Sequence, residues 1–527
     1  MPGTFWYHAH KHGSTALQVG QGASGLIIMD HTPDNPLPKA YLNMPEIQFV
    51  FQHINLPVLR AAANISGDLV TNWIDHNFEI TNSSTEVMNL MLVNMQFLPV
   101  VKMEVDKWYK WRMVLSSMEQ SLAFHSQTGN CEFKLLAKDG IYLQDAPRDV
   151  STVILSPGNR ADVAVRCHKI GLDPMNVTGI GLAPGCGLFD PEEQYDPSSQ
   201  WGTNWNVARR RSNYTHLLPN LLSRHAAGTF YDPKLMPEVL IVEVVPSSVD
   251  NNTSVDNNTN TDITEPLNVP TPCYLVDLRS VNESQIATTW TNEFSCDPNP
   301  PWPDESSPEN ICGIFGPTGN GGGGGDELIP FTNDTTYLSE FSTGTVQEFD
   351  LRFSTFHVYH QHVNPFQIVK FHTKDESLLD EDVTDWYKVG DWQDTLQWPN
   401  RQDPPSHVSV RFQADLFTGH MIMHCHLLFH EDQGMMGQYK IVGEEGATWE
   451  GARQINPSCI EPTKRSTESG IGVLNDTGTA VGILNDTDTA DLDILPEAYG
   501  DPSSSSTASV RFVALYFVAV TLNYFCV

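Results

Sequence analysis

The stretch HMIMHCHLLFHEDQGMM, residues 420–436, places Cys425 between His424 and His426 in an apolar run. The run follows a glycine, and its length and apolar character predict a buried β-strand. Successive side chains of a strand point to opposite faces, so the two histidines should share one face and the cysteine should point to the other. We therefore predict one strand that serves two metal centres, one on each face.

Two more donors follow the expected end of this strand. His430 and Met435 add an imidazole and a thioether, which a loop can fold onto the side of the cysteine. A thiolate, two imidazoles and a weak axial thioether form a blue-copper electron-transfer site. A zinc site is an alternative, but the sequence contains no Cys-x-x-Cys pair, the usual cue for structural zinc. A buried cysteine can also be a small core residue, so the choice depends on the rest of the chain.

Two other segments repeat the pattern. HVYHQHVNPFQIV, residues 357–369, carries His360 and His362 two positions apart, and GTFWYHAHKHGS, residues 3–14, carries His8 and His10 in the same spacing. A single pair of this kind is weak, because histidines two apart occur by chance in ordinary strands. Three pairs together with the interposed cysteine are poorly explained by chance, and they favour copper.

These segments resemble the second, third and fourth copper motifs of the multicopper oxidases, a group that includes laccases, ferroxidases, ascorbate oxidases and bacterial copper-efflux oxidases. The last motif, with its HED and paired methionines, is similar to the bacterial copper-efflux and spore-coat versions. LVNMQFLP, WYKWRMVLSS and the stretch 135–167 resemble the family's second domain, so the resemblance runs from residue 3 to about 443. It implies an all-β fold of tandem cupredoxin-like Greek-key β-sandwich domains. Short β-branched runs broken by Gly, Pro and Asn independently favour antiparallel sandwiches.

The resemblance also implies a ligand set and a reaction. The type 1 copper would take His357, Cys425 and His430 with Met435 axial, one type 3 copper His10, His362 and His424, the other His8 and His426, and the type 2 copper His360. Electrons from a reductant would enter at the type 1 copper and pass through Cys425 to the three-copper cluster, which reduces O2 to water. Glu431 resembles an acidic residue that supplies protons; a hydrogen-bonded loop carboxylate is the alternative.

The sequence departs from the family at its start. The family pattern has a first His-x-His-Gly motif well upstream of residue 3, and this chain starts two residues before that point. The type 2 copper and one type 3 copper therefore each lack a histidine, and His12 is a poor substitute for one. We favour a truncated start, with oxygen reduction retained. The alternative is a type 1 electron-transfer or copper-binding protein without oxygen reduction.

The resemblance, together with composition changes along the chain, implies these domain limits: a stub of domain one at 1–45, domain two at 46–248, a linker at 249–266, domain three at 267–443, a polar stalk at 444–509 and an apolar tail at 510–527. The small residues, polar spacer and apolar tail resemble a lipid-anchor attachment signal. A single transmembrane helix is the alternative, although ~20 apolar residues are usually needed.

The cysteines and sequons favour a secreted protein. Nine cysteines occur, and removing Cys425 as a ligand and Cys526 in the tail leaves an odd number. We predict that Cys459 pairs with a cysteine in the domain missing upstream, which agrees with the resemblance, and that the other six form up to three disulfides of open connectivity. Eleven Asn-x-Ser/Thr sequons favour a glycoprotein at the outer cell surface.

The net charge of −34 opposes nucleic-acid binding, which requires basic patches. An acidic surface can concentrate metal cations, although solubility is the simpler explanation. The expected partners are O2 and a small reductant, either a metal ion such as Fe(II) or Cu(I) or a phenol, and we expect a monomer.

Overall fold

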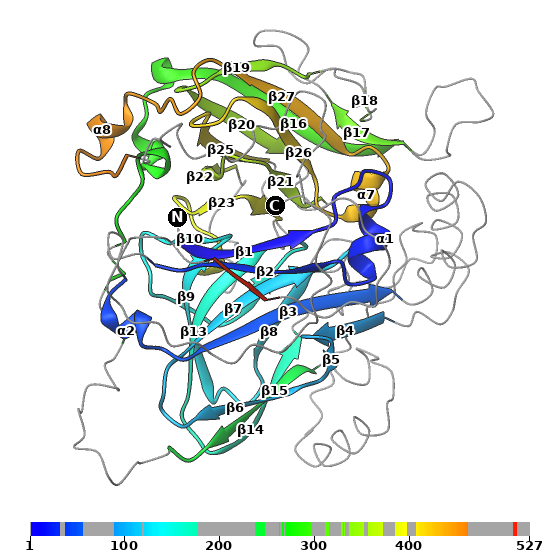
Figure 1. Ribbon diagram of the computed structural model, residues 1–527, viewed down its shortest axis with the longest axis vertical. Coiled ribbons are helices and arrows are strands. Elements are labelled where there is room, and N and C mark those ends of the chain that lie inside the picture. The colour runs from blue at the N-terminus through cyan, green and yellow to red at the C-terminus, as the bar shows by residue number, and fades with distance from the viewer. Residues whose placement is uncertain are drawn as a thin grey trace, which may run out of the picture.

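The computed structural model describes residues 2–31, 37–55, 89–118, 121–177, 238–247, 263, 266–267, 269–297, 311–315, 328–329, 331, 337–352, 357–372, 385–397, 407–461 and 510–513. Strands dominate this part of the chain and its helices are short, which confirms the all-β prediction. Figure 1 shows two groups of sheets, one above the other, with the first two strands of the chain lying between them.

The lower group in Figure 1 is a sandwich of two sheets. One sheet has the order β10-β9-β13-β7-β3-β4-β5, with β11 also pairing with β9; the other has the order β12-β8-β14-β15-β6. The ring centroids of Phe51 and Phe124, one from each sheet, lie 5.7 Å apart in the core between them. The strands of the first sheet are β3 Glu46–Asn55, β4 Asn89–Val93, β5 Gln96–Phe97, β7 Tyr109–Ser116, β9 Cys131–Lys138, β10 Ile141–Tyr142, β11 Arg148–Val150 and β13 Arg160–Cys167. Those of the second are β6 Val100–Glu104, β8 Leu122–Ser126, β12 Val153–Leu155, β14 Gly171–Val177 and β15 Glu238–Val245.

The upper group is a second sandwich, with sheets in the orders β18-β17-β16-β20-β25-β22-β23 and β19-β27-β26-β21-β24. Tyr439 and Phe349, from opposite sheets, pack with ring centroids 5.4 Å apart. The strands of the first sheet are β16 Ile286–Asp297, β17 Ile311–Phe315, β18 Leu328–Ile329, β20 Val346–Arg352, β22 Phe366–Phe371, β23 Trp392–Gln393 and β25 His407–Gln413. Those of the second are β19 Glu340–Ser342, β21 Tyr359–Gln361, β24 Thr395–Leu396, β26 Gly419–Cys425 and β27 Met436–Val442.

The start of the chain lies between these sandwiches. β1 Gly3–His8 pairs with β2 Ser24–Met29, and β2 also pairs with β28 Val510–Val513. One short helix, α1 Thr15–Gly20, lies between β1 and β2 in the chain, and a second, α2 Lys39–Leu42, follows β2. α1 packs on α7 Leu428–Asp432 through an apolar cluster that includes Ala16, Val19, Leu428 and Phe429. This packing brings the first histidine motif to the end of β26.

The segment 444–461, which the sequence assigned to a stalk, is folded against the upper sandwich. Its helix α8 Ala452–Ile455 joins an apolar cluster with the 3-10 turn Cys273–Leu275. Two further 3-10 turns follow Cys273–Leu275 in the chain: Leu278–Ser280 and Glu283–Gln285.

Disulfides join Cys131 to Cys167 and Cys273 to Cys459. The prediction that Cys459 pairs with a cysteine in an upstream domain is therefore wrong. The reason is backbone pairing, since Cys273 N donates to the carbonyl oxygen of Ile460 at 2.9 Å and lays the two segments side by side.

Candidate metal centres

The first donor set lies at the end of β26. The antiparallel register places Cys425 opposite Tyr359 of β21, two residues after His357. Helix α7 then returns His430 to the same position. Cys425 Sγ lies 3.7 Å from His357 Nδ1 and 3.8 Å from His430 Nδ1, and the two nitrogens are 3.2 Å apart.

These separations fit the edges of a metal coordination polyhedron. With metal–sulfur bonds of ~2.3 Å and metal–nitrogen bonds of ~2.0 Å, a tetrahedral angle places sulfur and nitrogen about 3.5 Å apart and two nitrogens about 3.3 Å apart. Cys425 is completely buried and is a free thiol. A thiolate with two imidazoles is the equatorial donor set of blue-copper sites, so the residues present fit a type 1 copper ion.

Met435 lies beside this set. Its backbone N donates to the carbonyl oxygen of His430 at 2.8 Å, and its carbonyl oxygen accepts from Cys425 N at 3.0 Å. The Met435 side chain is completely buried in the same core cluster as Cys425. The backbone thus holds Met435 next to two of the predicted ligands, and its axial role stays a prediction.

Burial keeps the imidazoles of this set neutral. It lowers the pKa of His430 to about 4, and burial together with His430 lowers the pKa of His357 well below its ordinary value. A neutral imidazole is the form that binds a metal ion. The site is therefore ready to take a metal at neutral pH without first losing a proton from either ring.

The same pKa shift predicts that the copper-free protein is sensitive to acid. Between pH 6.5 and about 4, the unfolded chain binds a proton at His430 and the folded chain does not, so stability falls as the pH falls. At pH 5 this one residue should cost ~2 kcal/mol of unfolding free energy. Denaturant unfolding of the copper-free protein at pH 7 and pH 5 measures the loss, and His430→Gln should show a smaller pH dependence. If the free energy of unfolding fell equally between pH 7 and pH 5 in the two proteins, the prediction would be contradicted.

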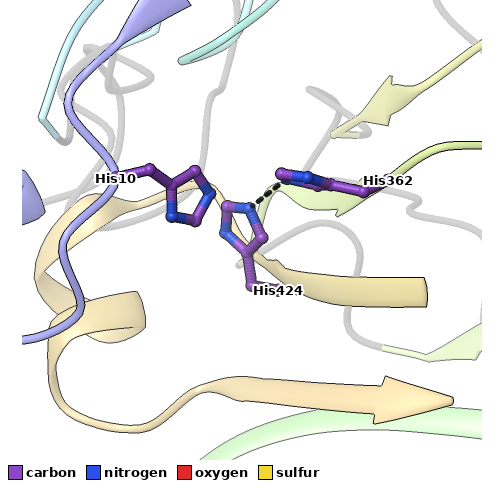
Figure 2. A group of neighbouring side chains, drawn as sticks. All are labelled: His10, His362 and His424. Atoms are coloured by element: carbon purple, nitrogen blue, oxygen red, sulfur yellow. Dashed lines mark hydrogen bonds between the residues drawn. The ribbon is translucent and has the colours of Figure 1, made fainter. Parts of the chain in front are cut away.

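The second donor set lies on the opposite face of β26. Six imidazole rings from β1, β21, β26 and the residues that follow them form a continuous cluster: His8, His10, His360, His362, His424 and His426. Neighbouring ring centroids are 4.8–5.4 Å apart. Figure 2 shows three of these rings, carried by three different segments, converging on one point. One ligand atom from each of the three lies within 4.8 Å of the others.

Hydrogen bonds at Nδ1 direct Nε2 of these rings inward. The carbonyl oxygen of Ala9 accepts from His8 Nδ1 at 2.9 Å, and that of Asp394 accepts from His360 Nδ1 at 2.9 Å. Because a carbonyl oxygen only accepts, Nδ1 carries the proton in both rings and the Nε2 lone pair is left for a metal. The Nε2 atoms of His362 and His424 are 3.3 Å apart, as the dashed line in Figure 2 marks.

Some nitrogens of the cluster have no protein partner. Among the described residues, His10 Nε2 and both ring nitrogens of His426 are buried without a hydrogen bond. An unpaired buried polar group costs about 1–3 kcal/mol, and a metal ion bound by these lone pairs would remove that cost. Burial, with the neighbouring rings, also lowers the pKa of His362 and His426 well below the ordinary value. The cluster therefore fits metal ions held by neutral imidazoles.

Glu431 bridges two histidines of the cluster. Its Oε1 lies 3.4 Å from His10 Nδ1, and its Oε2 lies 3.1 Å from His424 Nδ1. The Thr15 hydroxyl donates to Oε1 at 3.1 Å. Burial alone would raise the pKa of Glu431, but the attraction of His424 and His10 holds it well below its ordinary value. A carboxylate at this position fixes the Nδ1–H tautomers and so aims both Nε2 atoms at the metal.

The sequence prediction missed two residue groups that touch the cluster. Arg160 donates through Nη1 to Asp394 Oδ1 at 2.9 Å, and this carboxylate lies 3.5 Å from His360 Nδ1. A Cβ added to Gly158, whose φ is +83°, would lie only 2.7 Å from Nε2 of the His426 ring. The only sequence signal was that SPGNRADVAVRC belongs to the second-domain resemblance.

Asp394→Asn should weaken metal binding at His360. The asparagine loses the charge that pairs with Arg160 and that orients the imidazole, and loss of such a partner typically costs 10–100-fold in metal affinity. Copper titration followed by the electron paramagnetic signal of the non-blue copper measures the change, while the visible absorption of the Cys425 site should persist. Asp173→Asn, a buried carboxylate in β14 that accepts from Thr128, is the matched control. Equal copper affinity for the two variants would refute the orienting role.

A buried ionic network fixes the strand that carries His8. Arg112 of β7 donates to the Thr4 hydroxyl at 2.8 Å and to Asp162 at 3.0 Å, and Thr4 also donates to Asp162 at 2.5 Å. These contacts tie β1 to β7 and β13. The lower sandwich therefore holds the first histidine motif against the upper one.

The structure thus gathers all predicted ligands and Glu431 around two points, on opposite faces of β26. His12, which the sequence set aside as a poor substitute ligand, instead packs edge-on against Phe331 at 5.1 Å between ring centroids.

The fold has solved counterparts. The chain is similar to the McoA multicopper oxidase 2F4 variant from the hyperthermophile Aquifex aeolicus, with a TM-score of 0.51 and 19% identity over 84% of this chain and 76% of that one. It also matches the bacterial laccase-like multi-copper oxidase CueO from Ochrobactrum sp. at a TM-score of 0.49, with 16% identity over 84% and 77% of the two chains. A third match is the multicopper oxidase from Campylobacter jejuni, with a TM-score of 0.49 and 15% identity over 84% of this chain and 72% of that one. The likeness to the Aquifex protein shows the cupredoxin-like sandwich fold.

No curated protein sequence matches the chain. Residues 327–445, however, match the sequence profile of the multicopper oxidases. This matched segment carries Cys425 and both histidine motifs of the upper sandwich, so residues 327–445 are similar to the multicopper oxidases.

Proposed function

We propose that the protein couples one-electron oxidation of a small reductant to four-electron reduction of O2 to water. The observation that carries this proposal is the tripeptide His424–Cys425–His426. Cys425 Sγ faces His357 and His430, and the two flanking imidazoles lie in the histidine cluster on the other face of the strand. Two donor sets joined by one tripeptide serve a reaction in which electrons enter at one site and are used at the other.

Copper would supply one-electron redox chemistry at both donor sets and oxygen reduction at the histidine cluster. The chain provides the conduction path, since only the covalent bonds of the tripeptide separate the thiolate from the flanking imidazoles. It also keeps water out, because Cys425, His424 and His426 are completely buried. Every four electrons delivered require four protons, so a path for protons is needed as well.

We assign the proton path to Glu431 and Thr15. The carboxylate contacts two imidazoles of the cluster and accepts a hydrogen bond from the Thr15 hydroxyl. A carboxylate within hydrogen-bond reach of the reacting site can relay protons. The alternative assignment, in which Glu431 only orients His10 and His424, predicts that Glu431→Gln lowers activity equally at all pH values. Proton relay predicts a loss that grows as the pH rises.

The test is copper content together with oxygen consumption. A protein that reduces O2 should bind four copper ions per chain and consume one O2 per four electrons, whereas a type 1 electron carrier should bind one copper ion and consume none. A fully loaded protein that carries a single copper ion and no oxidase activity would refute the proposal and leave the carrier function.

The reductant is proposed only as a class. A metal ion such as Fe(II) or Cu(I) and an easily oxidised phenol both suit a type 1 site with an axial thioether from Met435. Comparing kcat/KM for Fe(II), Cu(I) and a phenol on the copper-loaded protein separates a ferroxidase-like enzyme from a laccase-like one.

We also propose an extracellular location with a carboxyl-terminal lipid anchor. The disulfides Cys131–Cys167 and Cys273–Cys459 support an oxidising compartment. Within the described residues, no helix has the length and apolar character needed to cross a membrane. Release of the protein from intact cells by a phospholipase that cleaves such anchors tests the proposal.

A further inference from the structure

A third donor cluster lies outside both copper-type sets. One ligand atom each from Asp350, His372 and His407 lies within 4.8 Å of the others. All three side chains are half-buried, so the cluster is open to solvent on one side. None of them is among the ligands discussed above.

Three neighbouring strands build this cluster. β20 and β25 pair so that Asp350 lies opposite Ser409, and His407 lies two residues before Ser409 on the same face. His372 follows the end of β22, and its backbone N donates to the carbonyl oxygen of His407 at 3.0 Å. The alternate residues of β25, Val408 and Val410, are completely buried in the core. The cluster therefore sits on the outer face of the sheet.

Ser409 holds two of the three groups toward each other. Its hydroxyl donates to Asp350 Oδ1 at 2.5 Å and accepts from His372 Nε2 at 2.7 Å. The rings of His372 and His407 stack with centroids 3.7 Å apart at an angle of 18°. Burial, with the nearby His407, lowers the pKa of His372, which favours the neutral ring. These contacts hold the three donors beside one another, and the stacked rings must rotate before both imidazoles can face one ion.

The charges around the cluster permit a cation. Arg411 is paired with Glu348 at 2.6 Å, and Arg352 lies 3.9 Å from Glu293, so acidic partners offset both guanidinium groups on this face. Lys370 of β22 is exposed, and its charge contributes to lowering the pKa of His372. The carboxylate of Asp350 supplies the negative charge that a divalent ion needs.

We propose that Asp350, His372 and His407 form an accessory site for one divalent transition-metal ion such as Zn²⁺. Two imidazoles and a carboxylate are ligands that zinc and similar ions accept, whereas Ca²⁺ and Mg²⁺ prefer oxygen ligands alone. Ligand atoms of a four-coordinate ion are about 3.3 Å apart, so binding would draw the three donors together and turn the rings of His372 and His407 out of their stack. Water would complete the coordination on the open side. The bound ion would link the ends of β20, β22 and β25.

The test uses the copper-loaded full-length protein, so that the copper-type donor sets are already filled. Equilibrium dialysis against ZnCl2, with metals counted by mass spectrometry, should find one zinc per chain in addition to copper. His407→Ala should weaken zinc binding at least about tenfold, and so should Asp350→Asn, whose side chain has nearly the same size. His420→Ala, an exposed histidine that contacts Tyr337, is the matched control and should bind zinc normally.

A second readout separates loss of the site from loss of the fold. Zinc should raise the Tm of the unsubstituted protein and of His420→Ala, and should leave the Tm of the two site variants unchanged. The visible absorption of the Cys425 centre reports that each variant is folded. Absence of zinc beyond the copper complement, or equal zinc affinity in folded Asp350→Asn and the unsubstituted protein, would overturn the proposal.

Discussion

Replacing Cys425 with serine should remove the intense visible absorption of the copper-loaded protein and lower reductant oxidation by at least about 10³-fold, a barrier increase of ~4 kcal/mol. The absorption of a blue-copper site depends on its thiolate ligand, and Cys425 Sγ is the sulfur that faces His357 and His430. The variant also breaks the path between the two donor sets, because serine oxygen does not reproduce the copper–sulfur bond. Absorption spectroscopy and oxygen consumption measure both effects.

Met421→Leu is the matched control for this substitution. Met421 is completely buried on the same strand, four residues before Cys425 and therefore on the same face. A volume-conserving core substitution usually costs less than about 1.5 kcal/mol, so this variant should keep the colour and the activity. If Cys425→Ser stayed blue, the copper assignment itself would be wrong.

Gly158→Ala should lower the rate of oxygen reduction about 10²-fold while leaving the visible absorption intact. The added methyl group would lie 2.7–2.9 Å from three atoms of the buried His426 ring, so the ring must move. A displacement of ~1 Å in a catalytic site commonly costs about 10²-fold in rate. Cys425 faces the other side of the strand, and its absorption should not change. Stopped-flow reduction of the blue centre, compared with steady-state oxygen consumption, separates the two sites.

Gly129→Ala is an unusually close control. Gly129 also has a positive φ, +67°, so alanine suffers the same backbone strain, but apart from its chain neighbours no atom of the described residues lies within 4 Å of its added Cβ. Both variants should therefore lose about 1–2 kcal/mol of stability from the left-handed conformation. Only Gly158→Ala should lower the rate of oxygen reduction. Equal activities in the two variants would mean that the His426 ring tolerates the methyl group.

The two substitutions divide the proposed reaction into halves. Cys425→Ser removes electron entry and spares the histidine cluster, and Gly158→Ala spares electron entry and disturbs the cluster at His426. Mixing the two variants should not restore activity, because the tripeptide His424–Cys425–His426 joins the halves within one chain.

Much of the candidate site was predictable from the sequence because its ligands are close along the chain. The alternation of side chains in β26 places His424 and His426 opposite Cys425, and the structure confirms that arrangement. The spacing in the motif 357–369 likewise predicted that His360 and His362 share a face. The family resemblance, and not the spacing, placed His357 with the thiol. The domain limits drawn from the resemblance and from composition stay predictions.

Other features depend on contacts between residues far apart in the chain. Asp394 and Arg160, 234 positions apart, meet beside His360. The close approach of Gly158 to His426 and the pairing of Cys459 with Cys273 have no local signal either. A glycine or an aspartate in isolation has many possible structural roles, so its type alone predicted neither contact.

The all-β class, the donor types and the faces of β26 to which they point follow from the local sequence, because strand alternation is a local property of the backbone. Long-range packing, in contrast, sets which residues orient the donors, how β1 is held between the sandwiches, and that Asp350, His372 and His407 meet on an outer face. Those arrangements arise from packing and buried charge pairing between segments far apart in the chain. Residue type and local spacing do not predict such contacts.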